Sequence, residues 1–171
     1  MLPTNFYLYF LTALIPLLIG AIYYHPKVLG GIWQRTNKFT DEYIASGNMP
    51  LIFGLTCLFG LMLSAFLPSL IIHQTNVASI MMPEIMESGS AVQSEFNTFM
   101  DTYGDRFRGF KHGVAHGFFT TLFFVLPIIA INALFERRGW KYIAIHSGYW
   151  ALVLMLMGGV LCEFLAYVPV S

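Results

Sequence analysis

Four long apolar stretches, separated by polar connections, dominate this chain of 171 residues. They cover residues 5–24, 51–72, 113–134 and 142–168, and the first two contain no charged residue. A helix needs roughly 20 mostly apolar residues to cross a bilayer. Since each stretch reaches that length, the pattern predicts an all-α integral membrane protein, a four-helix bundle that forms a single domain.

A shorter pattern of period 3.6 lies in the connection between the second and third stretches. Its apolar residues recur at spacings of three and four, as expected of one helical face: Val92, Phe96, Phe99, Met100 and Tyr103. Ser90 followed by Gln93 resembles a helix-capping box. The pattern predicts a short amphipathic helix over residues 90–103, which lies on the outer face or caps the bundle.

Composition supports the membrane assignment. Hydrophobic residues make up 57% of the chain and charged residues only 11%, whereas a soluble domain carries about a quarter charged residues. The partner of such a surface is the lipid bilayer. Nine basic and nine acidic residues give a formal net charge of zero, so the balance of charge does not indicate a nucleic-acid partner.

The ends of the chain and its cysteines add two expectations. The N-terminus lacks the basic region and small-residue cleavage site of a signal peptide, so we expect the first stretch to be retained. Cys57 and Cys162 are too few for a disulfide framework. The predicted topology puts them near opposite membrane faces, and we expect that they do not pair.

Charges in the connections predict the orientation. Residues 25–49 and 135–141 carry six basic residues: Lys27, Arg35, Lys38, Arg137, Arg138 and Lys141. The long connection 73–111 carries three, Arg106, Arg108 and Lys111, together with five acidic residues. By the positive-inside rule the two shorter connections face the cytoplasm, and both termini lie on the outer side.

Small residues mark faces where helices can approach closely. Gly109, Gly113 and Gly117 repeat every four residues, and Gly158 and Gly159 lie in the fourth stretch. Helices in lipid associate through such close contacts and through polar groups. These glycines predict packing faces, either within the bundle or between subunits.

Ionisable residues near the outer ends of the stretches are candidates for chemistry, because such groups are costly in a membrane. They are His73, His112, His116 and Glu163. His112 and His116 are four residues apart and share a helical face. Imidazoles and a carboxylate suit Zn²⁺ or a similar divalent ion, with water in the fourth position. The alternatives are hydrogen bonding without a ligand and proton transfer.

A second polar layer lies at the inner ends and contains Tyr24, His25, Asn132 and His146. These side chains can line a small polar pocket, or they can anchor the helices at the interface, where tyrosine is favoured. The chain shows no nucleophile with its base, no phosphate-binding loop and no dinucleotide fingerprint. No catalytic residue is assigned, and a divalent metal ion is the one cofactor that the sequence suggests.

Two blocks of sequence carry a family resemblance. One is residues 23–30 (YYHPKVLG), with Trp33 after it; the other starts at residues 110–117 (FKHGVAHG) and continues through 132–138 (NALFERR), 141–143 (KYI) and 148–150 (GYW). Together they resemble the bacterial membrane-protein family called domain of unknown function 1761. The acidic segment 76–108 contributes nothing to the likeness. The resemblance implies a multi-pass protein of the cytoplasmic membrane with about four spans, and it implies no activity.

Two functional hypotheses follow. The favoured one is a non-enzymatic component of a membrane assembly, associating with other subunits or with itself. The alternative is a ligand-handling protein that binds a metal ion or relays protons through the outer histidines and Glu163. A transporter is the weakest hypothesis, because transport sites are usually built between repeats.

Overall fold

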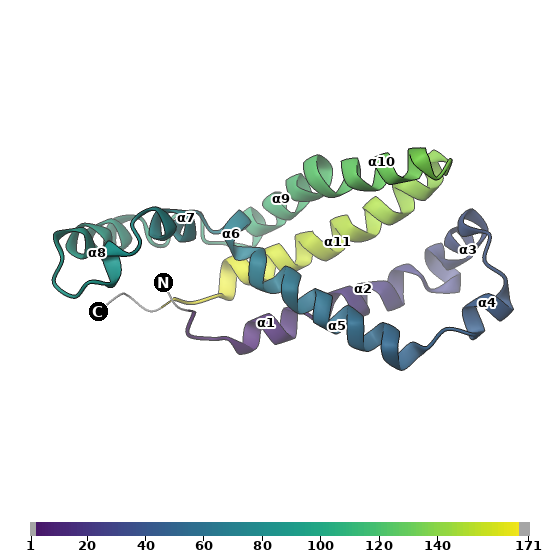
Figure 1. The fold of residues 1–171 in the computed structure, drawn as a ribbon, viewed down its shortest axis with the longest axis horizontal. Helices are drawn as coiled ribbons and strands as arrows, with labels where there is room; N and C mark the ends of the chain where they lie inside the picture. The colour runs from purple at the N-terminus through teal and green to yellow at the C-terminus, as the bar shows by residue number, and fades with distance from the viewer. Residues whose placement is uncertain (1–2, 168–171) are drawn as a thin grey trace.

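The computed structural model describes residues 3–167, which are almost entirely helical (Figure 1). The first half contains α1 (Tyr7–Thr12), α2 (Ile15–Tyr23), the π-helix η1 (Pro26–Gly30), α3 (Gly31–Asn37), α4 (Asp41–Ala45), α5 (Met49–Phe66), α6 (Pro68–Ile71) and α7 (His73–Ile80). The second half contains the 3₁₀-helix η2 (Glu84–Met86), α8 (Ala91–Tyr103), α9 (Phe110–Thr120), the π-helix η3 (Thr121–Val125), α10 (Leu126–Phe135) and α11 (Trp140–Phe164).

Three helical segments are long and apolar enough to cross a membrane: Met49–Ile71, Phe110–Phe135 and Trp140–Phe164. A fourth candidate is a bent pair, Tyr7–Tyr23 with Pro26–Asn37, whose two parts meet at 55°. The chain is therefore an all-α protein with three or four segments that could span a membrane. Its lipid-facing character shows in the large apolar side chains exposed along α5 and α10.

The first segment, predicted as a span over residues 5–24, is broken within that range and bends again just after it, and prolines explain both breaks. The ring of Pro16 would clash with the carbonyl of Thr12 in a continuous helix, and α1 ends at Thr12. A residue before proline favours extended backbone, and His25, which precedes Pro26, is extended at φ −63° and ψ 139°. The chain bends there before α3.

The glycine faces lie where α9 packs against α11. A Cβ on Gly113 or Gly117 would overlap the backbone of α11, at Gly158 and Leu154 respectively. A Cβ on Gly158 would lie 2.5 Å from the Gly113 carbonyl oxygen. Gly159 instead makes room for the ring of Phe110, and a Cβ on Gly109 would meet only Glu163 Oε2, at 3.7 Å.

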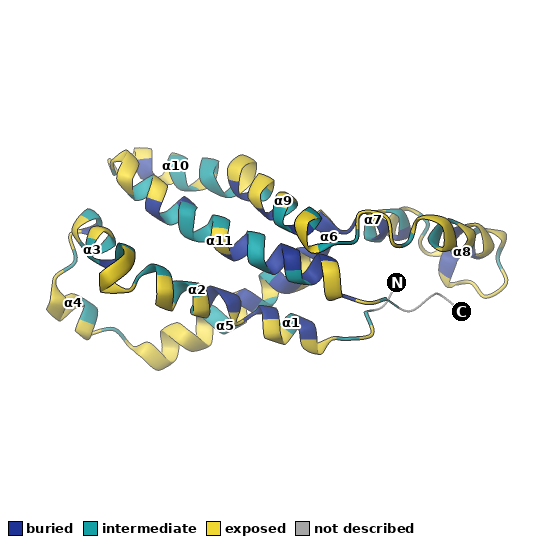
Figure 2. Ribbon diagram, turned by 180° about the vertical axis from the view of Figure 1, so that it is seen from behind, coloured by how far each residue is buried: buried dark blue, intermediate teal, exposed yellow. Residues whose placement is uncertain are grey.

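Buried residues gather where α1, α5, α6 and α11 meet, shown in dark blue in Figure 2. Ile71, Met157 and Leu161 are fully enclosed there. The hydroxyls of Thr12 and Ser64 hydrogen-bond at 2.6 Å and link α1 to α5 inside this core. Because this core lies at one end of the spans, it holds the elements of that end in fixed positions.

Both ends of the described chain lie beside this core (Figure 1). Thr4 donates its N–H to the Ala166 carbonyl at 2.9 Å, and the Asn5 amide bonds the Phe164 carbonyl at 2.7 Å and the Ala166 N–H at 3.0 Å. Leu165 is extended, so α11 ends at Phe164. The fourth stretch was expected to reach residue 168, which lies outside the described residues.

The connection between α6 and α9 projects beyond the core at the same end (Figure 1). Within the predicted segment 90–103, α8 buries Phe96 against Ile85 and Ala78, from η2 and α7. Ser90 Oγ accepts the Gln93 N–H at 3.0 Å, and Gln93 Oε1 accepts the Gly89 N–H at 2.9 Å. The helix thus packs on its own connection, with both N-terminal caps satisfied.

Candidate metal centre

His73 owes its position to a sharp change of direction between α6 and α7. Ile72 is buried and extended, with φ −111° and ψ 101°, and α7 begins at the next residue. The buried amide of Gln74 then donates to the backbone carbonyls of Tyr103, Gly104 and Arg106 at 2.8–3.0 Å. These bonds tie the start of α7 to the chain that leads into α9, and so hold His73 beside that helix.

His112 and His116 lie on the first two turns of α9. The neighbouring glycines of the same helix, Gly113 and Gly117, are buried against α11. Because residues one apart on a helix point about 100° away from each other, the histidine pair faces away from α11, toward His73.

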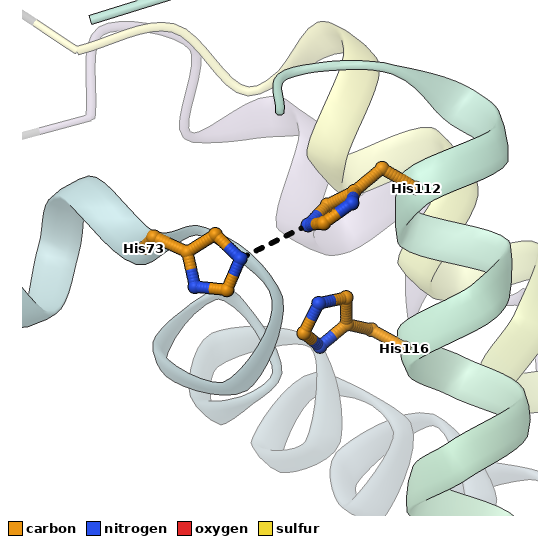
Figure 3. Close-up of side chains that lie close together, drawn as sticks. All are labelled: His73, His112 and His116. Atoms are coloured by element: carbon orange, nitrogen blue, oxygen red, sulfur yellow. Dashed lines mark hydrogen bonds between the residues drawn. The ribbon is translucent and has the colours of Figure 1, made fainter. Parts of the chain in front are cut away.

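The three imidazoles converge (Figure 3). One nitrogen from each ring can be chosen so that all three lie within 4.8 Å of one another. The Nε2 atoms of His73 and His112 are 3.2 Å apart. Ring centroids are 4.4 Å apart for His112 and His116, and 5.1 Å from His73 to each of them.

This spacing suits shared coordination of one ion. Zinc binds histidine nitrogen at about 2.0–2.1 Å with tetrahedral geometry, which places two ligand nitrogens about 3.3 Å apart. The 3.2 Å separation of the His73 and His112 nitrogens matches that edge. Without an ion, the same contact is a hydrogen bond that needs a proton on one of the two nitrogens. The cluster can therefore hold either a proton or a metal ion between these rings.

The rings around the cluster limit its freedom. Phe107 stacks on His112, with centroids 5.3 Å apart and planes at 26°, and meets His73 edge-on at 5.9 Å. The His116 ring interacts with the backbone of Leu70. Ligand histidines commonly use their second nitrogen to bond a backbone carbonyl or carboxylate, which fixes the ring orientation. His73 is exposed and the other two are partly buried, so the site is open at the surface of the protein.

Glu163, expected as a ligand, takes another position in the structure. Its Oε2 accepts the Phe110 N–H at 2.6 Å and so caps the start of α9. Arg108 makes the reciprocal contact and donates to the carbonyls of Cys162 and Leu165 at the end of α11. Glu163 thus positions the helix that carries the histidines and is not part of the three-histidine group.

Gln74 and Phe107 were missed in the sequence. Gln74 was visible as a polar neighbour of His73 at the end of an apolar stretch. Phe107 gave no signal of its own, because its contact with the two histidines depends on the course of the chain after α8.

The structure distributes the inner polar residues over separate contacts. Tyr24 packs among Tyr23, Trp33 and Tyr149, with centroids 5.2 Å away in each case. The other three make separate contacts: His146 packs on Tyr142, the Nδ1 atom of His25 accepts the Lys27 N–H, and Asn132 is exposed. Within residues 3–167, no hydrogen bond or ring contact joins any two of Tyr24, His25, Asn132 and His146.

Comparison with known proteins identifies a family without an activity. No curated protein and no solved structure matches the chain. The family model described as "Protein of unknown function (DUF1761)" matches residues 8–162 and so runs through the segment 76–108 as well. Since this match covers nearly the whole chain, the protein belongs to the DUF1761 family.

Proposed function

We propose that this protein binds a divalent transition-metal ion, zinc or one with similar preferences, at one end of its membrane spans. His73, His112 and His116 supply the ligands. The observation that carries the proposal is the convergence of three imidazoles, from two separate elements, within 4.8 Å. Two histidines four residues apart on one helix lie close together because of their spacing alone. His73 comes from another element, and only the fold brings it to the same place.

The donor set suits metal chemistry with an open position. Three histidines leave one place in a tetrahedral shell, which water or another ligand fills. Imidazole nitrogen suits zinc, copper, iron and nickel, and it does not suit calcium or magnesium, which prefer oxygen. The partial exposure of the cluster gives an ion a route from the aqueous side.

The packing of α9 favours this proposal over self-association. The glycines that suggested contacts between subunits are used within the chain, where Gly113 and Gly117 meet α11. A role as an accessory subunit of a larger assembly stays a prediction.

We place the protein in the cytoplasmic membrane as a four-span bundle, in which Tyr7–Tyr23 crosses the membrane as the first span and Pro26–Asn37, bent from it by 55°, lies at its cytoplasmic end. The six basic residues in the connections 25–49 and 135–141 support a cytoplasmic location for that end. The histidine cluster and both termini then lie on the outer side.

The test is elemental analysis of the detergent-purified protein, prepared with a tag that contains no histidine. We expect about one ion per chain in the parent and none in the His112→Ala/His116→Ala variant. The chain offers a matched control, His25→Ala/His146→Ala, which removes two histidines outside the cluster and should keep the ion. Metal-free parent protein after incubation with zinc, or equal loss in both variants, would refute the proposal.

A further inference from the structure

A second surface, far from the histidines, has the character of a binding groove. It lies between α3 and the start of α11, at the end of the molecule opposite the termini (Figure 1). Its volume is about 740 Å³, and its lining includes Leu29, Ile32, Arg35, Trp140, Lys141 and Ile145. The groove thus combines two cations with an apolar wall.

The two cations come from different elements and lack acidic partners. Arg35 lies on α3 and Lys141 on α11, and both are exposed. Among residues 3–167 the ion pair found joins Arg138 to Glu136 at 3.6 Å, so neither Arg35 nor Lys141 has a carboxylate within 4.0 Å. The carboxylate of Asp41 is held by the Gln34 amide at 2.6 Å. An anion between the two cations would meet little competition from the chain itself.

The apolar wall of the groove is exposed. Trp140 is 73% exposed and Ile32 41% exposed. Tryptophan concentrates at the membrane–water interface, because its ring is amphipathic and sits at the level of the head groups. Since Trp140 is the first residue of a spanning segment, the wall lies at the depth where lipid head groups meet acyl chains.

We propose that this groove binds an anionic phospholipid. Its phosphate lies between Arg35 and Lys141, and its acyl chains follow Leu29, Ile32 and Trp140 into the membrane. A guanidinium matches the geometry of phosphate oxygens, and basic pockets between spanning helices are known to bind anionic head groups. A soluble phosphate would leave the apolar wall without a partner, so the groove fits an amphiphile better than a free ion.

The experiment measures lipid binding to the full chain in detergent by native mass spectrometry. Phosphatidylglycerol is titrated against phosphatidylcholine, for the parent and for Arg35→Gln/Lys141→Gln. The matched control, Lys27→Gln/Arg137→Gln, removes two charges from the same end but from residues that do not line the groove. Each cation near a membrane surface contributes about fivefold to anionic-lipid binding, so we expect about a 25-fold loss in the groove variant and little change in the control.

Three results would overturn the proposal. Equal loss in both double variants would indicate diffuse charge attraction, and equal binding of both lipids would show no site for an anion. Displacement of the lipid by equimolar glycerol 3-phosphate would indicate a site for free phosphate. Arg35→Lys keeps the charge but loses the guanidinium fork, so it should bind more lipid than Arg35→Gln and less than the parent, which separates loss of charge from loss of folding.

Discussion

Among single residues, some side chains would touch the ion, and others only hold those ligands in position. His73, His112 and His116 each offer one nitrogen to a common point. Glu163 and Gln74 act on backbone groups: Glu163 caps α9 at Phe110, and Gln74 holds the chain from Tyr103 to Arg106 against α7. Substitutions of the ligands and substitutions of the positioning residues should therefore have different effects on metal binding.

Replacing a ligand histidine should strongly weaken metal binding. His73→Ala removes one of three donors. We expect metal affinity to fall by more than the 10- to 100-fold loss that is typical when a residue that only orients a ligand is replaced. Because imidazole binds a metal only in its neutral form, affinity in the parent should also fall as the pH drops from about 8 to about 5. Competition with a chromophoric chelator measures both effects. A His73→Ala variant with parental affinity would remove His73 from the site.

Replacing Glu163, which caps α9, should weaken metal binding less than replacing a ligand. Glu163→Ala leaves the Phe110 N–H without its acceptor, and loss of a helix cap costs about 1 kcal/mol of unfolding free energy. We expect a lower melting temperature in detergent and a bound ion that is weakened but present. Glu163→Gln keeps an acceptor oxygen and serves as the control. If Glu163→Ala abolished metal binding, as we expect of His112→Ala/His116→Ala, Glu163 would be a ligand after all.

At the scale of elements, the contact between α9 and α11 places the histidine pair. Gly113 and Gly117 let the two helix backbones touch, and the opposite face of α9 then meets α6 and α7. The positions of the two histidines on α9 therefore depend on this contact between the helices.

Gly113→Ala tests that contact. The added Cβ would overlap the backbone at Gly158, so the helices must separate, at a cost of about 3 kcal/mol for overpacking. We expect both thermal stability and metal affinity to fall. Gly54→Ala is the control: a Cβ there meets nothing within 4 Å, and alanine in a helix should be neutral or stabilising by about 1 kcal/mol. A Gly113→Ala protein as stable as Gly54→Ala would show that the close contact is not needed.

Apolar length and spacing predicted the elements better than their arrangement. The stretches 113–134 and 142–168 overlap the helices Phe110–Phe135 and Trp140–Phe164, because hydrophobic length controls membrane spans. Pro16 and Pro26 mark in the sequence where the first segment breaks, but they do not fix the 55° angle between its two parts. Among the site residues, the spacing of His112 and His116 indicated a shared face, but the role of Glu163 depends on how α11 is rotated against α9, which no local pattern encodes.

At the scale of the whole molecule, the two ends differ in chemistry. One end carries the histidine cluster, α7, α8 and both termini, and the other carries α3, the turn after α10 and six basic residues (Figure 1). Such an asymmetry is what the positive-inside rule associates with orientation.

Orientation is testable with reporters fused to the C-terminus. Because the basic end should stay in the cytoplasm, we expect an alkaline phosphatase fusion to be active and a fluorescent protein that folds only in the cytoplasm to be dark. The reverse pair of results would place the histidine cluster on the cytoplasmic side.

The central claim is that three imidazoles share one ion, and X-ray absorption of the zinc-loaded protein tests it most directly. The account predicts a shell of nitrogen and oxygen at about 2.0–2.1 Å, with the outer scattering of three imidazole rings. The His25→Ala/His146→Ala variant should give the same spectrum. A sulfur shell at about 2.3 Å, or the scattering of a single imidazole, would contradict the account.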